Sequence, residues 1–211
     1  MVMNPTFRIL HVCVANICRS PIGERLTRHG LAARLGSAAS SFHVASAGTR
    51  GLVGQPMHHH GADALRGLGV DADGFQARRL DPELLREADL VLTATATERD
   101  RAVAMVPAAL RTTFTLLEFA RLLGGTTLPA FDGDPVERAR TVVARARSMR
   151  GRVPYVDPAL DDVADPRRTP EGFADCVAVM DPAVRTVVAA LAGGSVLPGS
   201  VARIPQPATR G

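Results

Sequence analysis

The amino-acid sequence predicts a small doubly wound α/β domain, in which a four-stranded parallel sheet carries helices on both faces. Two observations lead to this fold class. Short apolar, β-rich runs alternate along the chain with segments of helical pattern, which is the order typical of parallel sheets. Hydrophobic residues make up 46% of the 211 residues and charged residues 22%, and these are values of a globular chain of about one-domain size.

Four short segments are predicted to form the strands. They are rich in apolar, β-branched and aromatic residues, which favour extended backbone. Such runs are typical of parallel strands that are buried on both faces. The four segments are residues 7–12 (FRILHV), 42–46 (FHVAS), 89–94 (DLVLTA) and 111–117 (RTTFTLL).

Helices are predicted between these strands and after them. Ser20 is expected to serve as the N-cap of the first helix, because Pro21 suits the first helical position. Thr97 is expected to cap a later helix. The predicted helices span residues 20–35, 56–68, 82–88, 97–106, 118–123 and 169–191.

Residues 124–160 interrupt the alternation and are predicted to be an insertion in a single domain over residues 1–192. Pro, Gly and Asp gather at the ends of this insertion, and its middle, VERARTVVARARSMRGR, is basic and helical in propensity. We expect a solvated surface helix there, with a basic docking surface as the alternative. Residues 193–211 have no useful periodicity and are predicted to be a flexible tail.

The composition excludes several classes of protein. Three cysteines are too few for a secreted disulfide scaffold, and no apolar run approaches the roughly 18 residues of a transmembrane helix. The first twenty residues lack the pattern of a signal peptide, so we expect a soluble, cytoplasmic protein without a membrane partner. All 25 basic residues are arginine, but one Tyr and no Trp offer few stacking platforms, and we expect no nucleic-acid partner.

The most informative segment is HVCVANICRSP at residues 11–21. It places Cys13 at the carboxyl end of a predicted strand, and Arg19 follows five residues later at the start of a helix. Ligands bind at that end of strands in open α/β sheets, and a tight loop before a helix N-terminus attracts anions. Arg19 adds a planar guanidinium that can grip two phosphate oxygens at once.

The same positive field favours the thiolate form of Cys13, which is the nucleophilic form of a cysteine. Attack on a phosphate monoester would give a cysteinyl-phosphate intermediate, and the loop N–H groups would stabilise the transferring oxygens. The alternative is a buried structural cysteine that an arginine happens to follow. The other residues expected to line the phosphate-binding loop are Val14, Ala15, Asn16, Ile17, Cys18 and Ser20.

The motif CVANICRSP resembles the C-x-G-N-x-C-R-S-P signature of the low-molecular-weight protein tyrosine phosphatases, in their bacterial type. The resemblance continues through SAGT at residues 46–49, the GQP turn, LGVDADGFQARRL and DLVLTAT, and covers roughly residues 7–119 and 162–192. It implies an enzyme that hydrolyses phosphotyrosine. Cys13 would then be the nucleophile and Arg19 the phosphate clamp.

The resemblance also assigns supporting roles. Asn16 would hold the loop in its unusual backbone shape, Ser20 would hydrogen-bond the Cys13 thiolate, and Ser46 would support Asn16. Cys18 would form a reversible disulfide with Cys13 under oxidants. Two departures are expected to weaken catalysis. Ala15 stands where the family usually has Gly, at a position that favours glycine geometry, and Phe75 stands where a histidine of the supporting network is common.

A departing alcohol needs a proton donor, and the family uses an Asp followed by Pro on a late loop. We expect Asp165, in DVADPRRTPEGF, to be this acid, with Asp157 as the alternative. Asp81 and Asp181 are expected to be helix caps. Arginines at 167 and 168 replace the aromatic residues that follow the family's Asp-Pro, which favours substrates with acidic flanks.

Phosphotyrosine proteins are the expected partners, and the bacterial members suggest a tyrosine kinase or exopolysaccharide machinery by analogy. We expect no cofactor and no metal, since the side chains of His58, His59 and His60 would point about 100° apart on a helix. Three alternatives stay open. They are a thiol-dependent arsenate reductase, for which Cys176 would have to resolve the nucleophile, a protein arginine phosphatase, and a phosphate-binding module without turnover.

Overall fold

The computed structural model describes residues 5–124, 133–153 and 157–193. In it, four parallel strands form one sheet in the order β2-β1-β3-β4. The predicted α/β fold class is confirmed. The strands are β1 (Phe7–Cys13), β2 (Phe42–Gly48), β3 (Leu90–Thr93) and β4 (Thr113–Thr115).

Helices follow the strands in the predicted alternation. The α-helices are α1 (Arg19–Leu35), α2 (His59–Gly67), α3 (Pro82–Glu87), α4 (Ala96–Met105), α5 (Leu116–Gly124), α6 (Pro135–Met149) and α7 (Pro170–Ala192). The 3-10 helices are η1 (Gly36–Ser41), η2 (Pro107–Arg111) and η3 (Pro158–Asp161). No helix in the part of the chain that the structure describes has the length and apolar character needed to cross a membrane.

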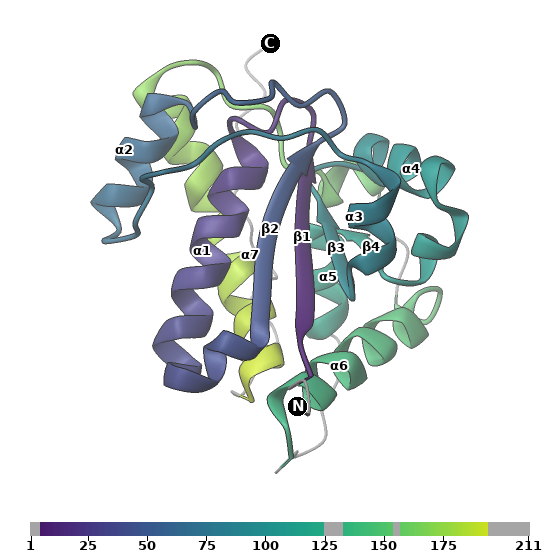
Figure 1. Ribbon diagram of the computed structural model, residues 1–211. Coiled ribbons are helices and arrows are strands. Elements are labelled where there is room, and N and C mark those ends of the chain that lie inside the picture. Colours follow the sequence, from purple (N-terminus) through teal and green to yellow (C-terminus); the bar gives the residue numbers. More distant parts are fainter. Residues whose placement is uncertain (1–4, 125–132, 154–156, 194–211) are drawn as a thin grey trace.

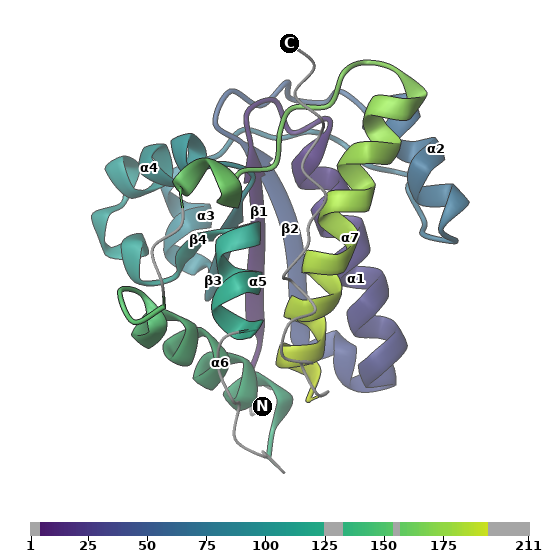
Figure 2. The same ribbon diagram turned by 180° about the vertical axis from the view of Figure 1, so that it is seen from behind.

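The sheet separates two hydrophobic cores, because successive side chains of a strand point to opposite faces. Ile9 packs into the larger core with apolar residues of α1, α5, α6 and α7. Leu10 points the other way and packs with Leu85 of α3 and Ala102 of α4. Figure 2 shows α5, α6 and α7 in front of the sheet.

The strand order places the loop after β1 where an open sheet binds ligands. From β1 the chain reaches β2 on one side of it, and β3 pairs with β1 on the other side. The point at which the strand order reverses therefore lies at the carboxyl end of β1, beside Cys13. At the top of Figure 1, this loop lies together with the segments that follow β2 and precede α7.

Three predicted helix caps are wrong. Helix α1 begins at Arg19, so Ser20 lies inside it, and α4 begins at Ala96 rather than after Thr97. Asp181 lies inside α7, where its carboxylate accepts from Arg185 at 2.7 Å. Asp81, in contrast, caps α3 by accepting from two backbone N–H groups.

Helix α6, at the centre of the predicted insertion, is packed against the larger core. Its apolar face is buried, and the side chain of Arg138 is buried too, donating to the carbonyl of Ala190 in α7 at 2.9 Å. The expectation of a solvated helix therefore holds only for the opposite face, which carries exposed arginines such as Arg140 and Arg147. Of the predicted tail, all residues after Gly193 lie outside the described part of the chain.

Because α6 contributes to the core, a charge on its buried face should destabilise the fold. Val142 is 2% exposed, and Val142→Asp is expected to lower the free energy of unfolding by more than about 2 kcal/mol, since the new carboxylate has no partner there. Ala144→Asp, on the exposed face of the same helix, should cost less than about 1 kcal/mol. Urea denaturation measures both, and equal small losses would show that α6 does not support the core.

Candidate active site

The segment between β1 and α1 forms a tight loop around the sulfur of Cys13. Asn16 has φ 58°, in the left-handed region that Asn tolerates better than most other residues. Asn16 is the sole non-glycine residue with positive φ in the described chain, so Ala15 does not occupy that region. The expectation that Ala15 stands at a position of glycine geometry is therefore wrong.

The carbonyl groups of the loop point outward. Those of Cys13, Val14, Ala15 and Ile17 accept hydrogen bonds of 2.8–3.0 Å from the backbone N–H groups of Thr49, Arg50, Leu52 and His58. A trans peptide places its N–H opposite its C=O, so outward carbonyls turn the loop N–H groups toward the concave side. Helix α1 adds the positive end of its dipole at the same place, and the loop is therefore suited to an anion.

Gly48, the last residue of β2, allows this close approach of two backbones. A Cβ at Gly48 would lie 2.5 Å from the carbonyl oxygen of Val14 and 2.9 Å from the backbone nitrogen of Asn16. Both contacts are with main-chain atoms, which cannot swing aside as a flexible side chain can. The segment that receives the loop carbonyls can therefore pack here because residue 48 has no side chain.

Cys13 lies at the closed end of the loop and is 2% exposed. Its sulfur is 2.9 Å from the hydroxyl of Ser20 and accepts from the backbone N–H of Asn16 at 3.3 Å. The Ser20 hydroxyl also accepts from the side-chain amide of Asn16 at 2.8 Å, which leaves its single proton to donate to the sulfur. Both contacts stabilise negative charge on the sulfur.

The amide of Asn16 is fully engaged. Besides Ser20, it donates to the hydroxyl of Ser46 at 2.9 Å, and its oxygen accepts from the backbone N–H of Arg78 at 2.8 Å. The hydroxyl of Ser46 in turn donates to the carboxylate of Glu24 at 2.6 Å. The structure thus brings Ser46 to Asn16, as the resemblance implies.

The roles of Glu24 and Arg78 in this hydrogen-bond network were not predicted, although the position of Glu24 in the sequence indicates its role. Glu24 stands four residues after Ser20 on α1, so both side chains lie on one face of the helix. Arg78 comes from a loop far away in sequence and gives no such signal. Phe75, expected to weaken this network, is partly buried against the larger core, and Glu24 and Arg78 complete the hydrogen bonds of Asn16 and Ser46.

The guanidinium of Arg19 spans the loop and the segment before α7. Its side chain is 6% exposed, and it donates to the carbonyl of Val163 at 2.9 Å and pairs with the carboxylate of Asp165 at 2.9 Å. Its Nε–H is buried without a partner among the described residues. An unpaired buried donor is costly, so this N–H is suited to an anionic ligand.

Asp165 and its alternative, Asp157, have different environments. The side chain of Asp165 is 69% exposed and reaches Arg19, beside the loop. Asp157 caps η3 by accepting from the backbone N–H of Ala159 at 2.9 Å. The structure therefore brings Asp165 to the predicted site, while the Asp157 carboxylate caps a 3-10 helix.

The other two cysteines are buried thiols. Burial, reinforced by the negative charge of Asp165, raises the pKa of Cys18 to about 11. Burial in α7 raises the pKa of Cys176 to about 12, and its sulfur contacts that of Met180 at 3.7 Å. Neither thiol is ready to act as a nucleophile at neutral pH.

A cavity of about 520 Å³ opens beside the loop, lined by Ile17, Leu52, Gln55, Pro56, Met57, His58 and His59. The histidines on one side of this cavity pack against other rings. His58 precedes α2, and its ring stacks on Phe173 with centroids 4.6 Å apart and on His59 at 4.7 Å. Burial and the neighbouring His59 and Arg168 lower the pKa of His58.

Within the described residues, no group of three or more His, Cys, Asp or Glu side chains is arranged to hold a metal.

Sequence comparison relates this chain to bacterial phosphatases. The low molecular weight protein-tyrosine-phosphatase Etp of Escherichia coli (strain K12) is 39% identical over 99 residues, which are 47% of this chain and 62% of Etp. The low molecular weight protein-tyrosine-phosphatase Ptp of Acinetobacter johnsonii is 31% identical over 108 residues, which are 51% of this chain and 70% of Ptp. This chain therefore spans less than two thirds of the length of Etp.

Structure comparison agrees at the level of the fold. The crystal structure of the tyrosine phosphatase AmsI from Erwinia amylovora superposes with a TM-score of 0.60, covering 90% of this chain and 96% of AmsI. The sequences of that pair are 22% identical. The four parallel strands and their helices therefore form an arrangement that AmsI shares.

The family model described as low molecular weight phosphotyrosine protein phosphatase matches residues 8–128. This range includes β2, β3, β4 and all of β1 except Phe7, together with the loop around Cys13 and the buried guanidinium of Arg19. The match extends over more than half of the sequence, and the chain belongs to the low molecular weight phosphotyrosine protein phosphatase family.

Proposed function

We propose that this protein hydrolyses phosphate monoesters of tyrosine in proteins, through a cysteinyl-phosphate intermediate on Cys13. One observation carries the proposal: the sulfur of Cys13 lies at the closed end of an anion-binding loop, with Arg19 and Asp165 paired beside it. Family membership and the tyrosine phosphatases among the relatives support the same activity.

In the first step, the phosphate occupies the concave side of the loop. The loop N–H groups and the unpaired Nε–H of Arg19 bind its oxygens, and the sulfur of Cys13 attacks phosphorus in line with the departing tyrosine oxygen. The P–O bond to tyrosine breaks as the S–P bond forms. The Ser20 hydroxyl, 2.9 Å from the sulfur, stabilises the thiolate before attack and again when it leaves.

Asp165 supplies the proton for the departing tyrosine oxygen. Phosphate oxygens compete with the Asp165 carboxylate for Arg19, so phosphate binding frees this side chain to face the leaving group. In the second step, the Asp165 carboxylate takes a proton from water, which attacks the phosphocysteine. The S–P bond breaks, and inorganic phosphate and the Cys13 thiolate are formed.

The cavity beside the loop favours an aromatic phosphoester. Ile17 and Leu52 present apolar side chains there, which suit a tyrosine ring and offer no hydrogen bond to the guanidinium of phosphoarginine. Arg167 and Arg168 follow the acid and favour acidic residues next to the phosphotyrosine. A protein phosphorylated by a bacterial tyrosine kinase is the substrate class that we propose.

The arsenate reductase alternative is less well supported. It needs a pair of further cysteines to resolve the modified nucleophile, but the sequence has only Cys18, in the loop itself, and Cys176, which is buried in α7 with a raised pKa. A panel of phosphopeptides with phosphotyrosine, phosphoserine or phosphoarginine, assayed with inorganic arsenate in parallel, separates the candidates. Release of phosphate fastest from phosphotyrosine is expected, and no release from any peptide would remove the proposed activity.

Cys13→Ser should abolish turnover while leaving oxyanion binding largely intact, because the loop N–H groups and Arg19 remain. Phosphate release is expected to fall at least about 1,000-fold, since the nucleophile is lost. Binding of inorganic phosphate, measured by calorimetry, should stay within about tenfold of wild type. Turnover by Cys13→Ser within tenfold of wild type would exclude the cysteinyl-phosphate mechanism.

Asp165→Asn should slow hydrolysis of phosphotyrosine by about 100-fold or more, because its leaving oxygen needs a proton. The loss on p-nitrophenyl phosphate should be smaller, since that leaving group is more acidic. Asp157→Asn is the matched control, which removes a helix-capping carboxylate, and should change both rates by less than about threefold. Steady-state and burst kinetics check this, and a crippled Asp157→Asn beside a normal Asp165→Asn would assign the acid to Asp157.

Mild peroxide should inactivate the protein reversibly through a Cys13–Cys18 disulfide. Peroxide oxidises Cys13 to a sulfenic acid and is itself reduced to water. The Cys18 thiolate then attacks the sulfenic sulfur, and the S–O bond breaks to release hydroxide, which takes a proton from solvent. Because the pKa of Cys18 is about 11, its thiolate fraction rises about tenfold for each unit of pH between 7 and 9. With excess peroxide, disulfide formation followed by mass spectrometry should accelerate in that proportion. A rate independent of pH, or inactivation without a Cys13–Cys18 disulfide in the mass spectrum, would contradict this assignment.

A further inference from the structure

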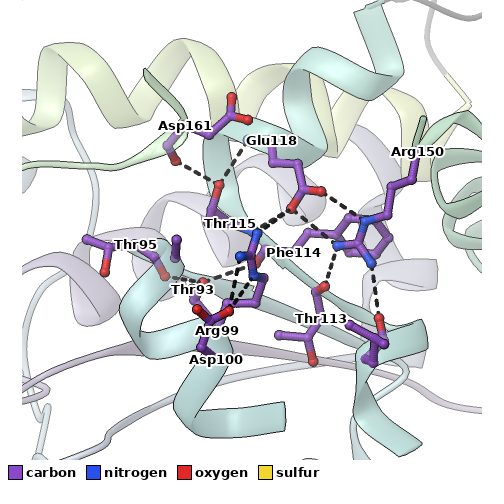
Figure 3. A network of polar contacts seen from close by, with 12 residues as sticks. Thr93, Thr95, Arg99, Asp100, Thr113, Phe114, Thr115, Glu118, Arg150 and Asp161 are labelled. Carbon is purple, nitrogen blue, oxygen red and sulfur yellow. Dashed lines mark hydrogen bonds and ion pairs between the residues drawn. The ribbon is translucent and has the colours of Figure 1, made fainter. Parts of the chain in front are cut away.

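A network of polar contacts joins β4 and α5 to the segment that carries Asp165 (Figure 3). It begins at Thr115, which precedes α5 directly. The Thr115 hydroxyl accepts from the backbone N–H of Glu118 at 3.1 Å, and the Glu118 carboxylate accepts from the N–H of Thr115 at 3.2 Å. This reciprocal pair is a capping box, and it fixes the Thr115 side chain at the start of the helix.

Asp161 is held by this helix through both its backbone and its side chain. The Thr115 hydroxyl donates to the Asp161 carbonyl at 2.7 Å. Arg121, one turn beyond Glu118, donates from Nε and Nη2 to the two carboxylate oxygens of Asp161 at 3.0 and 2.6 Å. Such a two-point contact fixes direction as well as distance, and Asp161 is 9% exposed, so solvent screens the pair little.

Asp162 and Val163, which follow Asp161 on the way to Asp165, are also held by hydrogen bonds. The Asp162 carboxylate accepts from the backbone N–H of Ala96 at 2.7 Å, and the N–H of Val163 donates to the carbonyl of Ala94 at 2.8 Å. The carbonyl of Val163 accepts from Arg19. Asp161 is therefore the first of three consecutive residues whose contacts together set the path of the backbone toward Asp165.

The orientation of the Asp165 carboxyl group depends on its backbone, because the side chain has few contacts of its own. It is exposed, and its ion pair is with Arg19, the group that would bind phosphate. When phosphate occupies Arg19, the carboxyl group must be aimed by the chain that carries it. Asp161 and its partners on α5 are the ion pair at the start of the hydrogen-bonded run, Asp161 to Val163, that leads to the acid.

The residue that follows α6 makes further contacts with the capping box at the start of α5. Arg150, which follows α6, donates to the two oxygens of Glu118 at 2.9 and 3.2 Å and to the carbonyl of Thr113 at 2.6 Å. Its guanidinium also lies over the ring of Phe114, 3.9 Å from the centroid. These contacts, visible in Figure 3, hold the Glu118 carboxylate in the capping box.

We propose that Arg121 is a positioning residue for the general acid: by holding Asp161, it fixes the backbone that aims Asp165 at the leaving group. This inference rests on the proposed function, since an acid is needed only if phosphate esters of poor leaving groups are cleaved. Within the described residues, Arg121 pairs with Asp161 and makes no hydrogen bond or ion pair with Cys13 or the phosphate-binding loop. Its effect should therefore act through proton transfer and not through phosphate binding.

Arg121→Met removes the two-point contact and keeps an unbranched side chain in its place. The variant should lower kcat/KM for phosphotyrosine, which reports the steps up to the phosphocysteine, about tenfold, a partial loss of what the acid contributes. For 2,4-dinitrophenyl phosphate, whose leaving group departs without a proton, kcat/KM should fall less than about twofold. The inhibition constant of inorganic phosphate should stay within about twofold, because the loop and Arg19 are intact.

Two further variants serve as controls. Arg66→Met removes the contacts of Arg66 with Asp63 and Asp73, at 3.0 and 2.8 Å on the exposed surface of α2, and should leave both esters unaffected. Arg121→Lys keeps the charge but cannot form the two-point contact with Asp161, so its phosphotyrosine rate should lie between those of Arg121→Met and wild type. All assays are run well below the melting temperature of each variant, so that unfolding does not enter the rates.

The decisive measurement is a double-mutant cycle with Asp165→Asn. If Arg121 acts through Asp165, Arg121→Met should change the phosphotyrosine rate less than about twofold in the Asp165→Asn background. A tenfold loss in that background as well, or equal losses on both esters, would overturn the positioning role. If wild type cleaves none of the esters, it is the proposed function that fails. If Asp165→Asn slows phosphotyrosine cleavage as expected and Arg121→Met does not, the positioning role of Arg121 is refuted and the proposed function stands.

Discussion

Three hydrogen bonds to the side-chain amide of Asn16 hold the loop in a backbone conformation that few residues adopt. The left-handed φ of Asn16 turns the chain so that loop carbonyls face outward and N–H groups face inward. The same amide orients the Ser20 hydroxyl, so its proton points at the sulfur of Cys13. The orientation of the amide is fixed by its partners Ser46 and the backbone N–H of Arg78, and Ser46 is itself held by Glu24. The shape of the anion site and the environment of its nucleophile therefore share one cause.

Arg19 links this loop to the late segment that carries the acid. One buried guanidinium contacts the Val163 carbonyl and the Asp165 carboxylate, and its Nε–H has no partner in the described part of the chain. A phosphate would satisfy that N–H and compete for the contact with Asp165. Charge neutralisation at Arg19 and release of the acid are thus coupled through a single side chain, which is fixed because it is buried.

Local signals in the sequence predicted the four strands and the loop, because short apolar runs and the CVANICRSP motif report on neighbouring residues. They failed where a distant partner or a buried face decided the outcome. Ser20 has the residue type of a cap, but its hydroxyl finds Cys13 instead. Asp181 precedes a proline, yet α7 continues through Pro182, since burial of its apolar face outweighs the roughly 3 kcal/mol that an internal proline costs. Arg78 and the pairing of Arg121 with Asp161 join residues distant in sequence, which no local pattern reveals.

The two buried thiols have a practical consequence for labelling. With pKa values of about 11 and 12, Cys18 and Cys176 remain protonated at neutral pH, and a protonated thiol reacts slowly with alkylating reagents. Cys13 is the remaining cysteine of the chain, and it receives donors from Ser20 and Asn16. An alkylating label small enough to enter the loop would therefore mark the Cys13 sulfur selectively, without any change to the sequence. A bound anion would cover that sulfur, so the extent of labelling would report whether the loop is occupied.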